Sequence, residues 1–236
     1  AKQVAEGKVE DVFVHGYRDQ TQGFERDFVQ RAPTFFTNEL FLLRDGQPVK
    51  IDKPDSATAG VHREWLLLEL RDDWQVGSTT HAAGSLLACK LVAFLAGERT
   101  FDALFTPGPR TSLAGYSPTR NHILLNVLDS VKNRVYVLTH SKDGWRREPL
   151  PGLPEFGTIS ASAVDDETSD DYFLTITDYL TPTSLWLGTI GKGAPERLKS
   201  LPALFDAQDL EVAQHEAKSA DGTLVPYFLV MKKSAA

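Results

Sequence analysis

The stretch ELFLLRDGQPVK, residues 39–50, contains an apolar strand pattern, a turn dipeptide and a second short extended segment. The dipeptide is Asp45-Gly46, and glycine accepts the positive φ that a two-residue hairpin turn requires. The stretch therefore predicts a β-hairpin. The pattern returns three more times along the chain.

The repeat has a nearly constant interval. Segments similar to 39–44 lie at 88–95, 134–140 and 184–190, so that successive starts are 49, 46 and 50 residues apart. Each is followed by a shorter segment that ends in a proline; these are Gln47–Pro54, Arg99–Pro107, Trp145–Pro151 and Ala194–Pro202. Further strand candidates precede the hairpins; these are 12–18, 26–31, 64–71, one within 75–86, 111–117, 122–128, 158–164 and 172–178. Four strands in each ~40–50 residues are typical of a propeller blade.

We therefore expect an all-β fold, a partial β-propeller of about four four-stranded blades over residues 1–203. One segment has an alternative, because several apolar residues between Gly84 and Gly97 also have helical spacing. The matching interval favours a strand there.

The last part of the chain, residues 204–236, does not continue the repeat. It contains a link at 205–209, an alternating strand at 210–218 and a second strand at 223–231, joined through Asp221-Gly222. We expect a linker and a hairpin that belong to a different sheet.

Composition excludes several classes of function. The formal charge of −7 comes from 25 basic and 32 acidic residues without a basic block, so no footprint for nucleic acid or anionic lipid is present. Cys89 is the only cysteine, which excludes an intramolecular disulfide, and its apolar context predicts a small buried side chain. No apolar run reaches the ~20 residues of a membrane span. The first ten residues lack a signal-peptide core, and localisation stays open with the cytoplasm favoured.

Catalytic and metal-binding motifs are absent from the sequence. Gly-x-Ser-x-Gly does not occur, and Ser85, four residues after His81, is interpreted as a turn residue that opens a strand. The acidic run 165–171 lacks the glycine of a calcium loop and is expected to be a solvated turn. The six histidines lack metal-ligand spacing, and the four tryptophans are expected to pack between blades. We assign no catalytic, cofactor-binding or metal-binding residue and no cofactor.

Ser219–Phe228 matches the pattern Ser-x-Asp-Gly-Thr-x-Val-Pro-x-Phe, and at this hairpin the chain resembles the prolyl oligopeptidase family of serine peptidases. Residues 23–46, 177–186 and 204–217 also resemble the bacterial branch of that family. Members join a seven-bladed propeller to an α/β-hydrolase domain. The resemblance implies that this chain covers the second half of the propeller and the first hairpin of the hydrolase sheet, with the Ser-Asp-His triad outside it.

The resemblance implies a substrate-gating role, in which the propeller admits short peptides to a serine nucleophile that cleaves after proline. The chain itself is then expected to be inactive. Its partners are peptide substrates, reached through the missing catalytic domain, and exposed blade edges predict self-association of the isolated chain. One alternative is a self-contained small propeller that binds proteins or ligands, closed by pairing of 224–231 with 12–18. Another is a five-bladed glycosidase, for which no set of inward carboxylates is identified.

Overall fold

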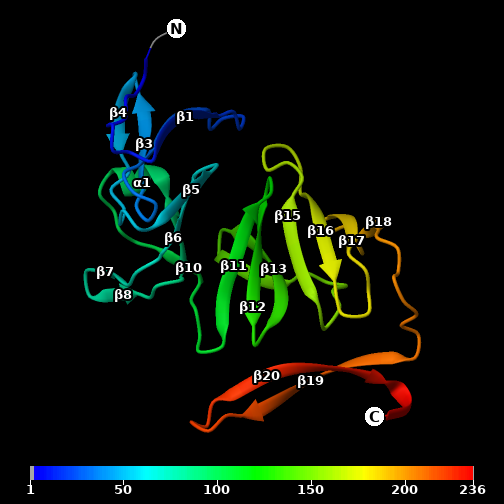
Figure 1. The fold of residues 1–236 in the computed structure, drawn as a ribbon. Coiled ribbons are helices and arrows are strands. Elements are labelled where there is room, and N and C mark those ends of the chain that lie inside the picture. Colours follow the sequence, from blue (N-terminus) through cyan, green and yellow to red (C-terminus); the bar gives the residue numbers. More distant parts are fainter. Residues whose placement is uncertain (1–2, 236) are drawn as a thin grey trace. The chain divides into compact units, whose positions relative to one another are not determined.

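The computed structural model describes residues 3–235 and contains four antiparallel sheets of four strands each, ordered as in the chain. The first two sheets consist of β1 (Phe13–Asp19), β2 (Arg26–Ala32), β3 (Glu39–Arg44) and β4 (Gln47–Lys50), then β5 (Thr58–His62), β6 (Trp65–Glu69), β9 (Leu86–Lys90) and β10 (Asp102–Phe105). The other two consist of β11 (Thr111–Pro118), β12 (His122–Asp129), β13 (Lys132–Ser141) and β14 (Gly144–Pro149), then β15 (Thr158–Ala163), β16 (Asp171–Thr177), β17 (Ser184–Thr189) and β18 (Glu196–Ser200). These are the four predicted propeller blades (Figure 1).

The chain divides into two compact units, with the boundary between Gly108 and Pro109. The first unit contains the first and second blades, and the second unit contains the third and fourth blades and a C-terminal hairpin. The hairpin consists of β19 (Leu210–Lys218) and β20 (Leu224–Lys232), which pair with each other in a two-stranded sheet and are followed by a 3-10 turn, η1 (Lys233–Ala235).

Apolar side chains between the first and second blades form the core of the first unit. Phe28 of β2 lies opposite Leu42 of β3, and both are buried against Leu66 and Leu68 of β6. The neighbour of these leucines, Leu67, is also buried, so the middle strand of the second blade is covered on both faces. This explains why β6 reads as a continuous apolar run rather than as an alternating pattern.

The second blade corrects two predictions. The strand predicted at 88–95 ends at Lys90, and the chain continues as the short helix α1 (Leu91–Leu95), which buries Leu91 and Phe94 at helical spacing. The strand expected within 75–86 is instead a separate small hairpin, β7 (Trp74–Val76) and β8 (Thr79–His81). The first strand of this blade, β5, was not predicted, because its sequence TAGVH contains a glycine and a histidine and has no apolar run.

Side-chain hydrogen bonds join the third blade to β15 of the fourth. Asn126 Nδ2 donates to the Ala161 carbonyl and Asn126 Oδ1 accepts from the Ala161 amide, both at 2.9 Å. Ser117 Oγ accepts from the Ala163 amide at 2.9 Å, and Asn133 Oδ1 accepts from the Ile159 amide at 3.3 Å. These groups lie on the side of β15 that faces away from β16, so they receive partners that a fifth strand would otherwise supply.

The turn between β12 and β13 adopts an unusual backbone. Ser130 and Val131 have φ of 49° and 64°, in the left-handed region. This region is sterically unfavourable for a β-branched residue such as Val131. The turn Asp45-Gly46 between β3 and β4 has similar φ angles, but its second residue is a glycine, which adopts them without strain. The carbonyl of Ser130 in this strained turn contacts the C-terminal hairpin.

Candidate functional site

The C-terminal hairpin, β19 and β20, is closed by the motif that carries the family resemblance. Asp221 Oδ1 accepts from the Thr223 amide at 2.9 Å and from the Ser219 hydroxyl, and Gly222 has φ of 89°. The Ser219 hydroxyl, together with the Thr223 contacts, lowers the pKa of Asp221 to about 2. The aspartate is therefore ionised at neutral pH, and the motif Ser-x-Asp-Gly-Thr fixes the register in which Gln214 lies opposite Phe228.

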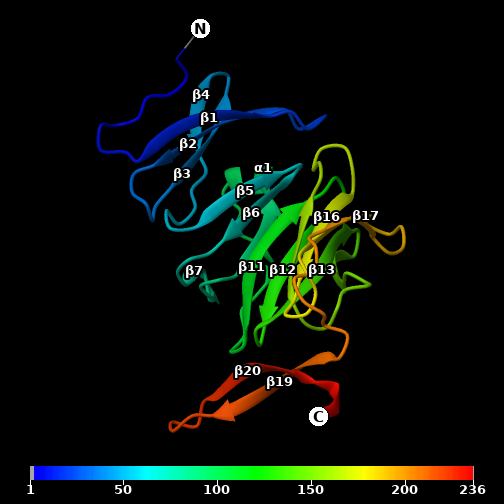
Figure 2. The ribbon, with the colours of Figure 1, turned by 45° about the vertical axis from the view of Figure 1, so that its right-hand side comes forward.

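One face of the hairpin lies on the third and fourth blades, and we call this contact the hairpin seat (Figures 1 and 2). Phe228 packs against Tyr179 and Phe156, with ring centroids 5.3 and 6.3 Å away. Gln214 Nε2 donates to the carbonyl of Ser130 at 3.0 Å. Arg110 and Glu216 form an ion pair. A hollow of about 270 Å³ remains beside Phe228.

The cation of Lys132 also belongs to the hairpin seat. Its Nζ lies 4.3 Å from the centroid of the Phe156 ring and 3.0 Å from Glu155 Oε1. The ammonium group therefore orders the aromatic ring on which Phe228 rests.

On its other face, the strand β20 carries exposed apolar side chains. Side chains alternate along a strand, so Val225, Tyr227 and Leu229 lie opposite to the face that carries Phe228. Their exposed fractions are 49%, 46% and 42%. His215 lies across from Tyr227 with ring centroids 5.5 Å apart. An apolar strip of this kind is typical of a surface that another part of a protein covers.

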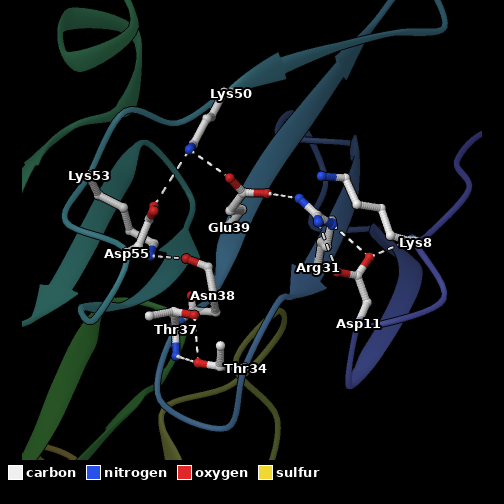
Figure 3. Close-up of polar contacts among 10 residues, drawn as sticks. All are labelled: Lys8, Asp11, Arg31, Thr34, Thr37, Asn38, Glu39, Lys50, Lys53 and Asp55. Carbon is white, nitrogen blue, oxygen red and sulfur yellow. Dashed lines mark hydrogen bonds and ion pairs between the residues drawn. The ribbon is translucent and has the colours of Figure 1, made fainter.

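A charged cluster lies on the first blade (Figure 3). Arg31 makes a two-pronged contact with Asp11, at 2.7 and 2.8 Å, and reaches Glu39 at 2.8 Å. Glu39 also pairs with Lys50 at 2.8 Å, and Lys50 lies 3.5 Å from Asp55.

Two acids of this cluster have a lowered pKa. The hydrogen bond from Arg31 lowers the pKa of Asp11, and the hydrogen bond from Lys50 lowers the pKa of Glu39. Asp11 and Glu39 are thus held ionised by their cationic partners, so neither is the poised proton donor that acid-base chemistry needs. Its effect is to fix the segment before β1 against β2 and β3.

Lys53 lies beside this cluster and is buried, with 5% of its surface exposed. Its Nζ donates to the carbonyls of Asn38 and Ala57 at 2.7 Å and of Pro54 at 3.2 Å. Burial lowers the pKa of Lys53 to about 8. This lysine connects the loop before β3 to the crossover that leads into β5.

The residues that the sequence singled out are distributed over the fold. Ser85 is 1% exposed and precedes β9, and the ring of His81 packs edge-on against Phe101 at 5.6 Å. Cys89 is buried and its thiol pKa is raised to about 12 by burial, which confirms the interpretation as a small apolar side chain. Within residues 3–235, no group of three or more His, Cys, Asp or Glu side chains could hold a metal ion. No helix of this described range is long and apolar enough to cross a membrane.

The tryptophans also have packing partners. Trp65 is buried beneath Lys90, whose Nζ lies 3.7 Å from its ring, and Trp74 packs against Phe101 at 5.1 Å. Trp186 donates to the hydroxyl of Ser184 at 2.8 Å and packs on the core of the second unit.

Residues 165–168 of the acidic run are exposed, as expected of a solvated turn, whereas Asp170 and Asp171 are partly buried. Asp165 accepts from the amides of Glu167 and Thr168 and so closes its own turn. Asp170 accepts from the Thr119 hydroxyl at 2.8 Å and from the amide and side chain of Asn121 at 2.7 Å. Asp165 and Asp170 therefore hold backbone in place, and Asp170 ties the fourth blade to the third. Sequence reasoning missed this role because the partners are 49 to 51 residues away.

The chain is similar to one part of longer proteins that are described as peptidases. An uncharacterized peptidase of Sinorhizobium fredii is 34% identical over 224 residues, which cover 92% of this chain and 31% of that protein. An uncharacterized peptidase of Rickettsia prowazekii is 29% identical over 215 residues, which cover 87% and 29%. No family model matches the sequence.

Solved structures agree in fold. The structure of a post-proline cleaving enzyme from Rickettsia typhi matches with a TM-score of 0.77 and 25% identity, over 97% of this chain and 34% of that one. Prolyl oligopeptidase B from Galerina marginata matches with a TM-score of 0.67 over 94% and 31%, and at 17% identity this likeness concerns the fold alone. The chain thus spans about a third of the length of these relatives.

Proposed function

Because this chain matches the propeller portion of the prolyl oligopeptidase family, we propose that it is the substrate-gating part of a serine peptidase that hydrolyses short peptides after proline. In this proposal residues 1–203 form part of the propeller, and residues 204–236 form the link and the hairpin that enters the catalytic domain. The triad and the oxyanion hole belong to that domain, and this chain supplies no catalytic residue.

The observation that carries the proposal is the match to the Rickettsia typhi post-proline cleaving enzyme, which runs from the first blade through the hairpin. The hairpin seat adds support, because it gives one face of the hairpin a place on the blades. The apolar face with Val225, Tyr227 and Leu229 is left for the catalytic domain to cover.

The gating role has a physical basis in the blades. Each blade is a rigid four-stranded sheet, and inter-blade contacts such as the one between Asn126 and Ala161 hold neighbours together. A ring of such blades offers a passage that an extended short peptide can enter and a folded protein cannot. Selectivity then comes from size.

The alternative of a self-contained binding propeller is less well supported. It requires β20 to pair with the first strand of the first blade. Among the described strands β20 pairs with β19, and β1 pairs with β2.

The test is a chimera, called the joined protein below. In it, this chain replaces the matching third of the Rickettsia typhi enzyme. We expect it to cleave a short fluorogenic peptide after proline and to leave a folded protein with surface prolines intact. The isolated chain should neither cleave the peptide nor react with a fluorophosphonate probe. An inactive joined protein that carries an intact triad, or stoichiometric labelling of the isolated chain, would refute the proposal.

A further inference from the structure

Two adjacent aromatic side chains protrude from the first blade. Phe35 and Phe36 lie in the loop that connects β2 to β3, and their exposed fractions are 87% and 86%. A phenyl ring kept in water forgoes the stabilisation that burial would give. Two of them side by side in the sequence point to a surface that another part of a protein covers.

The loop is held in place from both ends. Thr34 Oγ1 accepts from the amides of Phe36 and Thr37, each at 3.1 Å. Lys53 Nζ donates to the carbonyl of Asn38 at 2.7 Å, and the Asn38 amide donates to the carbonyl of Asp55 at 2.7 Å (Figure 3). The rings are therefore presented on a fixed backbone. Binding of a partner then carries only a small entropy cost for ordering this loop.

A groove of about 600 Å³ accompanies the two rings. Its lining comes from one end of the first and second blades, namely the starts of β1 and β5, the end of β2, the β2–β3 loop and the residues after β6. Besides the two phenylalanines, it is lined by Val12, Phe13 and Ala32 and by uncharged polar residues, with Arg71 and Asp72 as its charged members. Such a lining suits an apolar partner with a polar rim.

The repeat identifies which end of the blade this is. The β2–β3 loop joins the second and third strands of its blade, as the turn at Ser130-Val131 does in the third blade and the connection at Tyr179 does in the fourth. Both of those connections contact the hairpin, through the Ser130 carbonyl and the Tyr179 ring. Phe35 and Phe36 thus lie in the connection of the first blade that corresponds to the two connections that contact the hairpin in the third and fourth blades.

We infer that Phe35 and Phe36, with the groove beside them, are a docking surface for the catalytic domain to which the hairpin leads. This inference rests on the proposed function and names the residues of the first blade that the domain would cover. An apolar surface of the catalytic domain is the occupant, because the exposed rings offer no charge for an ionic partner.

The first experiment measures the accessibility of residue 36. We would compare Phe36→Cys in the isolated chain and in the joined protein, by the rate of maleimide labelling followed by mass spectrometry. Val92→Cys is the matched control, because Val92 is 73% exposed and lies in α1, between the third and fourth strands of its blade, at the other end. The buried native Cys89 serves as an internal standard. We expect labelling at residue 36 to be at least about 10-fold slower in the joined protein, and labelling at residue 92 to be unchanged.

The second experiment measures activity. Phe35→Ser with Phe36→Ser should lower kcat/KM of the joined protein for the proline peptide by about 5-fold or more, whereas Val92→Ser should not. The same double substitution should leave the melting temperature of the isolated chain unchanged, because neither ring is packed there.

Several results would overturn the inference. Equal labelling at residue 36 in the isolated chain and in an active joined protein would exclude docking while leaving the proposed function intact. Labelling that slows only when a peptide is added would assign the rings to substrate, and labelling that slows with chain concentration would assign them to a second copy. An inactive joined protein would remove the proposed function and this inference with it.

Discussion

Replacement of Asn126 by alanine tests how the third and fourth blades are joined. The substitution removes two hydrogen bonds of 2.9 Å and leaves the amide and the carbonyl of Ala161 without them, on a residue that is 3% exposed. Each unsatisfied buried polar group costs about 1–3 kcal/mol, so the expected loss in free energy of unfolding for the two groups is about 2–6 kcal/mol. At roughly 2–4 °C per kcal/mol for a chain of this size, the melting temperature should fall by about 4–24 °C.

Asn133→Ala is the matched control, because it removes a single, longer hydrogen bond of 3.3 Å to the Ile159 amide. It leaves one buried amide without this partner and should cost about 1–3 kcal/mol, half of the loss expected for Asn126→Ala. Thermal and urea unfolding give the stabilities, and hydrogen exchange at the Ala161 amide reports on the site itself. A melting temperature of Asn126→Ala within about 2 °C of that of the parent chain would refute this expectation. A larger loss of free energy of unfolding for Asn133→Ala than for Asn126→Ala would also refute it, because Asn126 would then not be the main link between the third and fourth blades.

Three further predictions concern other sites. Because burial lowers the folded-state pKa of Lys53 to about 8, below its unfolded value near ~10.4, the folded chain binds fewer protons between these values, and stability should rise with pH there relative to Lys53→Met. Urea unfolding at pH 7.5 and pH 10 tests this, and a parallel pH dependence of both proteins would contradict it. Val131→Gly should raise the free energy of unfolding by about 1 kcal/mol, since it relieves a φ of 64°; a thermal melt that shifts downward would exclude strain at this turn. Phe228→Ala should free the hairpin from its seat, so limited proteolysis should cut residues 203–209 several-fold faster, whereas Leu229→Ala on the opposite face should leave the rate unchanged. Equal proteolysis rates for the two variants would show that Phe228 does not hold the hairpin on the blades.

The repeat made most of the fold predictable. Strands of the first, third and fourth blades carry alternating or apolar patterns, and the last hairpin of each blade turns at glycine, at Gly46, Gly144 and Gly191–Gly193, so their order could be read directly. The second blade could not be read in this way. Its strand β5 is weakly apolar, and the run after Gly84 satisfies strand spacing up to Lys90 and helix spacing from Leu91.

The candidate site was only half predictable. The Asp-Gly turn and the strands of the hairpin followed from local sequence, as did the family resemblance. Which side chains meet across the fold did not, because Gln214 and Ser130 are 84 residues apart and Arg110 and Glu216 are 106 residues apart. The exposure of Phe35 and Phe36 could not be predicted from the sequence either, because adjacent aromatic residues usually indicate a buried core.

The contact between Asn126 and Ala161 bears on how such a chain could change over evolution. Because side chains satisfy the free edge of β15, the backbone ladder of one blade does not run on into the next. Each blade can therefore keep its own register. A duplication or loss of one blade would need only a few suitable polar residues at the new junction, and the number of blades could drift while the architecture of each stays the same.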